Sequence, residues 1–180
     1  MIDFSRNHFE LFGLPARFRF DHDMLDRAYR ELQSAVHPDR FAAAGESERR
    51  QALQSSARVN EAYQALKDPV ARAQYLLSLQ GVDALAETDT SLPLDFLECQ
   101  LERREAAETA MTAGDAPALE SILAGVRAEA AALEQHVAAI LDGGVASGAE
   151  CEAARVPVRE MKFLGKLAGD IDAMLGEMER

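Results

Sequence analysis

The amino-acid sequence predicts an all-α protein made of two helical domains, and three observations support this. Apolar residues recur at spacings of three and four along several long segments, which is the period of one helical face. No segment shows the apolar–polar alternation of a strand, and alanine, the strongest helix former, is abundant. Charge is also uneven: residues 1–77 hold 11 basic and 11 acidic side chains, whereas residues 78–180 hold 8 and 20. Such asymmetry indicates two units with different partners.

The composition limits the class of protein. With 180 residues, 48% of them hydrophobic, the chain is long enough for one large or two small packed domains. No window approaches the ~18 uninterrupted apolar residues of a membrane span, and the first residues lack the order of a signal peptide. We therefore expect a cytoplasmic protein with no membrane partner. The net charge of −12 argues against binding nucleic acid, whose phosphates need a basic surface.

The sequence shows no evident metal or catalytic centre. Cys99 and Cys151 belong to no CxxC or Cys/His pair with metal-ligand spacing, so we expect two reduced, buried side chains. The four histidines have no metal-ligand spacing either. No nucleophile stands in a recognisable turn, and no glycine loop could hold phosphate. We expect no cofactor, no metal and no enzymatic activity.

The first domain is expected over residues 1–79, with two long antiparallel helices and short helices beside them. The segment NHFELFGLP predicts a short helix that ends at Gly13. Asp21 is a suitable N-cap for the first long helix, and Asp68 caps a further helix that begins at Pro69. The apolar face of the first long helix is formed by Leu25, Tyr29, Leu32 and Val36. That of the second is formed by Ala52, Ser56, Val59, Tyr63 and Leu66.

The second domain is expected over residues 93–180, as an antiparallel three-helix bundle. It follows a polar, punctuated segment, residues 80–92, that we interpret as a linker. Breaks at TAGDAP and DGGVASG divide the domain into three helices whose apolar residues repeat at spacings of three and four. Pro157 either kinks the last helix or marks its start, and the pattern allows both.

The segment AVHPDRF interrupts the two long helices of the first domain. Pro38 ends the first helix near Val36, because it disfavours helical geometry at the residue before it. A turn needs the proline, but it needs neither His37 before it nor Asp39 after it. The simplest interpretation is a turn in which Asp39 caps the next segment. A general base with a carboxylate partner, or half of a metal site, is a weaker alternative, since no further group completes either.

The context of this tripeptide resembles the J domain of DnaJ-class co-chaperones, over about residues 9–77. HPD lies in the loop of an antiparallel helical hairpin, it follows a helix with a basic face, and Phe41 comes after it. The resemblance implies that the loop engages a DnaK-type chaperone and stimulates its ATPase. It assigns loop contacts to His37, Pro38 and Asp39, and charge complementarity to Arg27, Arg30 and Arg40.

Four segments together resemble the HscB family of co-chaperones over nearly the whole chain: FELFGLPARF, HPDRF, VNEAYQALKDPVARAQYLLSLQG and LDFLECQLERREAAE. The resemblance implies two protein partners. One is an HscA-type chaperone ATPase, and the other is the iron–sulfur scaffold protein IscU. The implied role is to deliver IscU to the chaperone during iron–sulfur cluster assembly.

The helix after Pro93 has two apolar faces. One is formed by small or aromatic residues that could face the bundle: Phe96, Cys99, Ala106, Ala107 and Ala110. The other is a stripe formed by Leu94, Leu97 and Leu101. From spacing alone, the stripe fits a protein-binding surface and a second buried side equally well.

The family resemblance favours a binding surface on this helix. It maps the scaffold-binding patch onto Leu97, Leu101, Glu102, Glu105 and Phe163. The sequence departs from the family pattern at Glu98 and Arg103, where apolar residues are common, so the extent of the patch is an open question.

Three other functions fit parts of the pattern. A J-domain protein could deliver polypeptide clients in general to a DnaK-type chaperone. A metal or cluster carrier could use Cys99, Cys151 and a histidine. An unrelated helical scaffold could contain HPD as a chance turn.

Overall fold

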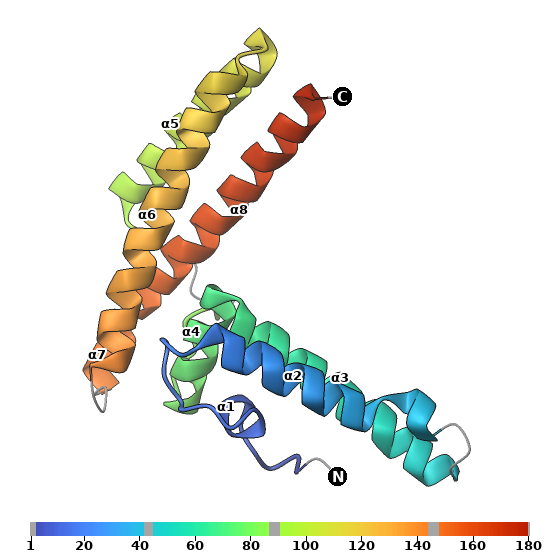
Figure 1. The fold of residues 1–180 in the computed structure, drawn as a ribbon. Coiled ribbons are helices and arrows are strands. Elements are labelled where there is room, and N and C mark those ends of the chain that lie inside the picture. The colour runs from blue at the N-terminus through green and yellow to red at the C-terminus, as the bar shows by residue number, and fades with distance from the viewer. Residues whose placement is uncertain (1–2, 42–44, 87–90, 144–147, 180) are drawn as a thin grey trace. The chain divides into compact units, whose positions relative to one another are not determined.

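A computed structural model describes residues 3–41, 45–86, 91–143 and 148–179 (Figure 1). Every regular element in these ranges is a helix, which confirms the predicted all-α class. The chain divides into two compact units, Met1–Leu76 and Leu77–Arg180. The elements are α1 (His8–Leu11), α2 (His22–Val36), the 3-10 helix η1 (Pro38–Phe41), α3 (Glu46–Lys67), α4 (Pro69–Leu79), α5 (Leu94–Ala113), α6 (Ala116–Asp142), α7 (Gly148–Ala153) and α8 (Arg155–Met178).

The first unit is built on the antiparallel hairpin of α2 and α3, with α1 beside it (Figure 1). The carboxylate of Asp21 accepts the backbone N–H of Asp23 at 2.9 Å, so this residue caps α2 as predicted. Asp68 does the same for α4, accepting the N–H of Ala71 at 2.7 Å. The fully buried side chains of this core include Phe9, Phe18, Leu25, Val59 and Leu66. On α3, Ser55 is buried and Ser56 only half-buried, which corrects the predicted face at that position.

A pair of stacked tyrosines joins the two long helices of the first unit. The rings of Tyr29 on α2 and Tyr63 on α3 lie 3.9 Å apart between centroids. The hydroxyl of Tyr63 donates to the carboxylate of Asp26 at 2.9 Å, and that of Tyr29 donates to the amide oxygen of Asn60 at 3.0 Å. These contacts fix how α2 and α3 pack, and with them the position of the loop between the helices.

The second unit contains the three long helices α5, α6 and α8, which run side by side (Figure 1). Their core is formed by Ala107, Ala110, Leu119, Leu123, Val126, Leu164, Leu167 and Ile171. This architecture confirms the predicted three-helix bundle, and α7 is a short addition before α8. Helix α8 begins at Arg155, so Pro157 lies in its first turn. A proline is tolerated there because the first N–H groups of a helix have no intrahelical partner, and Pro157 therefore marks the start of α8.

The segment over residues 80–92 is packed in its described part. Val82 and Ala84 are buried. The guanidinium of Arg159 on α8 donates to the carbonyl of Ala84 at 2.8 Å and to that of Ser91 at 2.9 Å. The described part of this segment is therefore not a solvated linker throughout, because α8 binds its backbone carbonyls.

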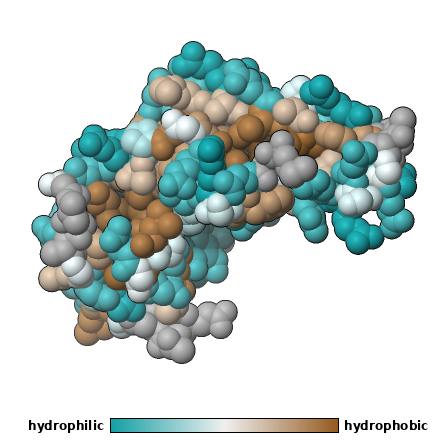
Figure 2. Space-filling model, turned by 90° about the horizontal axis from the view of Figure 1, so that it is seen from below, coloured by the Kyte–Doolittle hydropathy of each residue, from teal (hydrophilic) through white to brown (hydrophobic). Residues whose placement is uncertain are grey.

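The surface carries several large hydrophobic side chains. On the face drawn in Figure 2, hydrophobic residues are exposed in several places between hydrophilic ones. Among the described residues, the exposed large hydrophobic side chains are Phe4, Met24, Leu53, Leu79, Leu94, Leu97, Leu101 and Phe163. Leu94, Leu97 and Leu101 lie on α5 and Phe163 lies on α8. Exposed apolar side chains gathered on two helices are typical of a binding surface. No described helix has both the length and the apolar character needed to cross a membrane.

Candidate functional site

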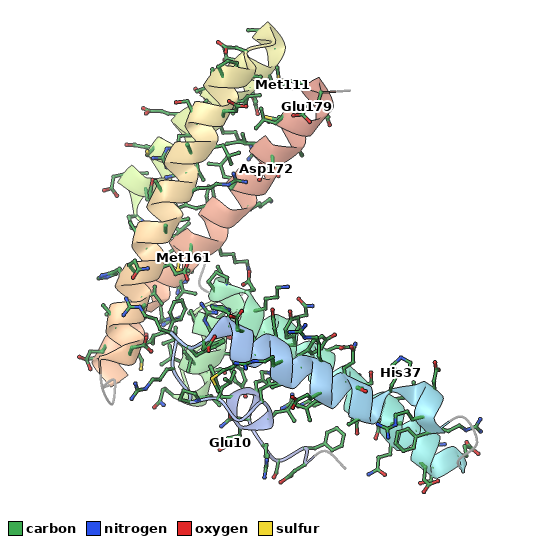
Figure 3. All side chains as sticks on the ribbon, in the orientation of Figure 1. Glu10, His37, Met111, Met161, Asp172 and Glu179 are labelled. Atoms are coloured by element: carbon green, nitrogen blue, oxygen red, sulfur yellow. The ribbon has the colours of Figure 1, made fainter. Side chains whose placement is uncertain are left out.

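The first candidate site is the loop that follows α2. Helix α2 ends at Val36, and His37 takes an extended conformation with ψ of 129°. Pro38 then opens η1, and the N–H of Arg40 donates to the carbonyl of His37 at 3.1 Å. The backbone of Pro38 is described, but its side chain lies outside the described part of the structure. Figure 3 shows His37 at the end of α2, far along the hairpin from α1.

His37 and Asp39 face one another across the proline. The N–H of Asp39 donates to Nδ1 of His37 at 3.3 Å. An oxygen of the Asp39 carboxylate lies 3.6 Å from the same nitrogen. The Asp39 side chain is 91% exposed, and α3 is capped at Gly45 and not at Asp39. An exposed carboxylate that caps no long helix is available to a partner.

Two arginines of α2 and one of the loop are exposed in the first unit. Nε of Arg27 donates to the carbonyl of Asp23 at 3.2 Å, and Nε of Arg30 donates to that of Asp26 at 3.1 Å. Both side chains are exposed and lie three residues apart, on neighbouring positions of one face of α2. Arg40, on η1, donates to the carbonyl of Ser34 at 3.3 Å.

The second candidate site is the leucine stripe of α5 together with Phe163 of α8. Leu94, Leu97 and Leu101 are 70%, 38% and 58% exposed, so the stripe is not a second buried side of α5. Phe163 is 36% exposed, and its ring packs edge-on against that of Phe96, with 5.7 Å between centroids. The structure therefore brings the apolar residues of the predicted patch to one surface.

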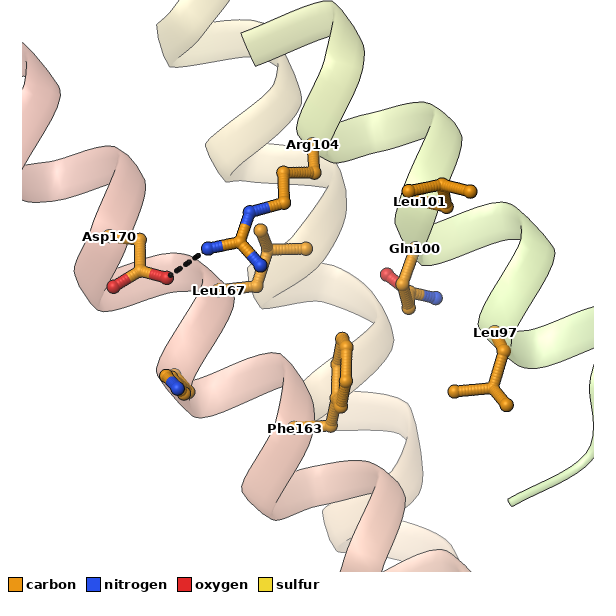
Figure 4. A pocket seen from close by; sticks show the side chains of 8 residues that line it. Leu97, Gln100, Leu101, Arg104, Phe163, Leu167 and Asp170 are labelled. Carbon is orange, nitrogen blue, oxygen red and sulfur yellow. Dashed lines mark hydrogen bonds and ion pairs between the residues drawn. The ribbon is translucent and has the colours of Figure 1, made fainter. Parts of the chain in front are cut away.

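A groove of about 210 Å³ runs between α5 and α8 at this patch (Figure 4). Leu97 and Leu101 line it from α5, and Phe163 and Leu167 line it from α8. Arg104 of α5 reaches across, with a terminal nitrogen 3.5 Å from the carboxylate of Asp170 on α8. The sequence did not single out Leu167, Arg104, Asp170, Gln100 and Lys166 as residues of this groove.

The inner face of α5 differs from the predicted one. Ala106 is exposed, whereas Gln100 is 2% exposed and Arg103 is half-buried. Arg103 donates to the amide oxygen of Gln100 at 3.0 Å and pairs with the carboxylate of Glu129 on α6. Arg103 therefore points toward α6 and not toward the patch. Although the family commonly has an apolar residue at position 103, the arginine does not interrupt the leucine stripe.

The acidic residues near the stripe lie on its far side from the groove. Glu98, Glu102 and Glu105 are all exposed on α5. Helical geometry places them next to one another, at spacings of three and four, beyond Leu94 and Leu101. They form an acidic margin of the patch and leave its apolar centre intact.

The described residues offer no cluster suited to a metal ion. No group of three or more histidine, cysteine or acidic side chains there has the arrangement to hold one. Cys151 is buried, as expected, and Cys99 is half-buried. Neither cysteine forms a disulfide bond.

Family models match both units. The DnaJ domain model matches residues 7–75, and the model of the HscB C-terminal oligomerisation domain matches residues 92–172. The curated co-chaperone protein HscB homolog of Burkholderia mallei (strain SAVP1) is 46% identical over 179 residues, 99% of each chain. That of Burkholderia multivorans is 44% identical over the same length.

Solved structures agree with these matches. The chaperone HscB from Vibrio cholerae superposes with a TM-score of 0.84 at 36% identity, covering 96% of this chain and 99% of its own. The human co-chaperone HscB gives 0.85 at 27% identity, covering 96% and 83%. Together with the exposed HPD loop and the helical bundle, these matches show that the chain belongs to the HscB family, the J-domain co-chaperones of iron–sulfur cluster assembly, whose J domain implies a DnaK-type chaperone as partner.

Proposed function

We propose that this protein delivers an IscU-type iron–sulfur scaffold to a dedicated HscA-type chaperone and stimulates the chaperone's ATPase. The observation that carries the proposal is the presence of two unlike exposed sites on separate units. One is a charged loop with basic side chains near it, and the other is an apolar patch with charged margins. The curated relatives are named co-chaperones, which fits an activity that lies in binding.

The chaperone would bind the first unit through the loop and the basic face of α2. Asp39 presents an ionised carboxylate that can form a charge-assisted hydrogen bond with a partner arginine. Pro38 sets the backbone of the loop, and His37 holds the N–H of Asp39. Arg27, Arg30 and Arg40 would meet acidic residues of the chaperone, which mainly raises the rate of association.

The scaffold would bind the second unit at the patch of α5 and α8. Leu97, Leu101 and Phe163 supply exposed apolar area at its centre. Glu102 and Glu105 supply charge at its margin. An apolar centre with a polar rim is the usual anatomy of a protein–protein interface.

Delivery follows from joining the two sites in one chain. Once the scaffold is bound, its local concentration at the chaperone is set by the connection between the units and no longer by the bulk solution. A cytoplasmic location fits this role, since both proposed partners would have to meet the protein in one compartment.

Binding of purified IscU by titration calorimetry tests the scaffold half of this proposal. We expect Leu97→Ala with Phe163→Ala to weaken binding at least tenfold, because truncating buried interface anchors costs more than ~1 kcal/mol each. Leu53→Ala is the control, since Leu53 is an exposed leucine on α3 that lies outside the patch. Unchanged affinity in the paired variant, with its helical content intact, would disprove the assigned patch and favour delivery of other polypeptide clients.

A further inference from the structure

The first turn of α5 carries two leucines of the stripe and has little of its own to hold it in place. Leu94 and Leu97 both lie there, and both are exposed. No residue of the described segment 91–99 is buried, and the first buried residue of α5 is Gln100. The N-cap residue Pro93 makes no side-chain hydrogen bond to the helix. A helix end without a side-chain cap or buried side chains frays readily.

Arg159 of α8 binds the chain just before this turn. Its side chain is buried, and Nη1 donates to the carbonyl oxygen of Ser91 at 2.9 Å and to its hydroxyl oxygen at 3.2 Å. Nε of the same guanidinium donates to the carbonyl of Ala84 at 2.8 Å. Because the guanidinium is planar and rigid, these contacts fix a position as well as a distance. Ser91 stands three residues before Leu94, so Arg159 fastens the start of α5 to α8.

A repulsion between the two helices opposes this contact. The pKa of Glu160, the neighbour of Arg159 on α8, is raised by burial, by Glu129 of α6 and by Asp95 in the first turn of α5. The carboxylates of Asp95 and Glu160 are therefore close enough to repel one another when both are ionised. At neutral pH this repulsion pushes the first turn of α5 away from α8, and the hydrogen bonds of Arg159 act against it.

The position of Arg159 on α8 relates it to the patch. Arg159 and Phe163 are four residues apart, so they lie on successive turns of one side of the helix. Phe163 lines the groove together with Leu97 of α5. If the first turn of α5 left α8, Leu94 and Leu97 would no longer share a surface with Phe163.

We propose that Arg159 is a positioning residue for scaffold binding. It holds the first turn of α5 on α8, and so keeps Leu94 and Leu97 beside Phe163. Arg159 itself is 7% exposed and has almost no surface to offer a partner. The inference rests on the proposed function, in which the patch binds the IscU-type scaffold. When only a fraction of the molecules has the turn in place, the apparent affinity falls by that fraction.

Arg159→Met tests the proposal, because methionine retains an apolar stem and removes every donor. The amides of residues 97–100 donate to carbonyls of the first turn and its cap, so we expect their hydrogen exchange to accelerate. Calorimetry should show a 3- to 10-fold loss of affinity for purified IscU, as when the turn is in place in about a tenth to a third of the molecules.

Arg127→Met is the control for this variant. Arg127 joins α6 to Asp172 of α8 at 2.7 Å, away from the start of α5. Removing this arginine should leave both the exchange of residues 97–100 and the affinity for IscU unchanged.

Arg159→Lys tests the same contacts with less risk to the fold. The lysine keeps the positive charge, but one ammonium group cannot reproduce the planar set of donors that joins Ala84 and Ser91. We expect exchange of residues 97–100 between that of the unmodified protein and that of Arg159→Met. Unchanged exchange and unchanged affinity in whichever of the two variants keeps its helical content would disprove the proposal.

A double-mutant cycle shows whether the loss of affinity acts through the leucines. In a Leu94→Ala/Leu97→Ala background the first turn has little left to present, so Arg159→Met should cost less than about 2-fold there. An equal loss in both backgrounds would indicate a general effect on the fold and overturn the positioning role. If IscU does not bind the unmodified protein, the proposed function fails, while hydrogen exchange still decides whether Arg159 holds the first turn.

Discussion

Glu160 is an acidic residue of α8 placed among other acidic residues. Burial raises its pKa, the carboxylates of Glu129 and Asp95 raise it further, and His136 opposes them. Because the pKa in the folded protein lies above that in the unfolded chain, the folded state binds more protons in the pH range between the two values. The free energy of unfolding therefore falls as pH rises through this range.

We expect Glu160→Gln to stabilise the second unit at neutral pH and to have little effect at about pH 3, below the ordinary pKa of a glutamate, where the carboxyl is protonated in both states. Thermal unfolding followed by far-UV circular dichroism at the two pH values measures this. Glu120→Gln, on an exposed position of α6, serves as the control. An equal rise in melting temperature at both pH values would contradict the charge explanation.

Single residues were predictable from the sequence where their role is local. Asp21 and Asp68 cap the helices that follow them, and Pro38 ends α2, because each acts on backbone groups a few residues away. Two residues of α5 lie on other faces than predicted: Ala106 is exposed and does not face the bundle, and Arg103 is half-buried and lies away from the patch. Helix α5 has alanines and long polar side chains on several faces, so its rotation depends on partners such as Glu129 that lie far away in the sequence.

The hairpin of α2 and α3 depends on a few polar contacts as well as on its apolar core. The hydroxyl of Tyr63 donates to Asp26 from the other helix in a partly buried setting. That of Tyr29 donates to Asn60 across the helices in an exposed setting and accepts from Nε2 of Gln33 on its own helix at 2.9 Å. A hydrogen bond shielded from water contributes more to stability than an exposed one.

We expect Tyr63→Phe to lower the free energy of unfolding of the first unit by about 0.5–1.5 kcal/mol, and Tyr29→Phe to lower it less. Tyrosine fluorescence during urea unfolding measures this, because the chain has no tryptophan and all three tyrosines lie in the first unit. If the two variants lose the same stability, the partly buried bond of Tyr63 has no special role.

Helices were predicted more completely than the segments between them. The long helices carry strong periodic patterns, so their existence followed from the sequence. The short helix α7 lies in a region with several glycines and was not expected. The packed part of residues 80–92 was interpreted as a linker, because its contacts with Arg159 of α8 leave no periodic signal.

At the scale of the whole molecule, the two units differ in charge and in exposed chemistry. The first is balanced in charge and presents a loop with an exposed carboxylate, beside Arg40. The second is strongly acidic and presents an apolar groove. The family resemblance implied both surfaces, but the groove became visible only when α5 and α8 were placed side by side (Figure 4).

The central claim is that the two sites act together, and single-turnover ATP hydrolysis by an HscA-type chaperone tests it most directly. The protein would be added with and without IscU, beside Asp39→Asn and Leu97→Ala/Phe163→Ala. We expect Asp39→Asn to abolish stimulation, since the change removes the charge of a fully accessible side chain and leaves the fold intact. Glu61→Gln on α3 is its control.

We expect the paired change in the patch to remove only the additional stimulation that IscU provides. Stimulation by Asp39→Asn equal to that of the unmodified protein would contradict the role of the loop. The absence of any effect of IscU on the unmodified protein would contradict the account of a two-site adaptor.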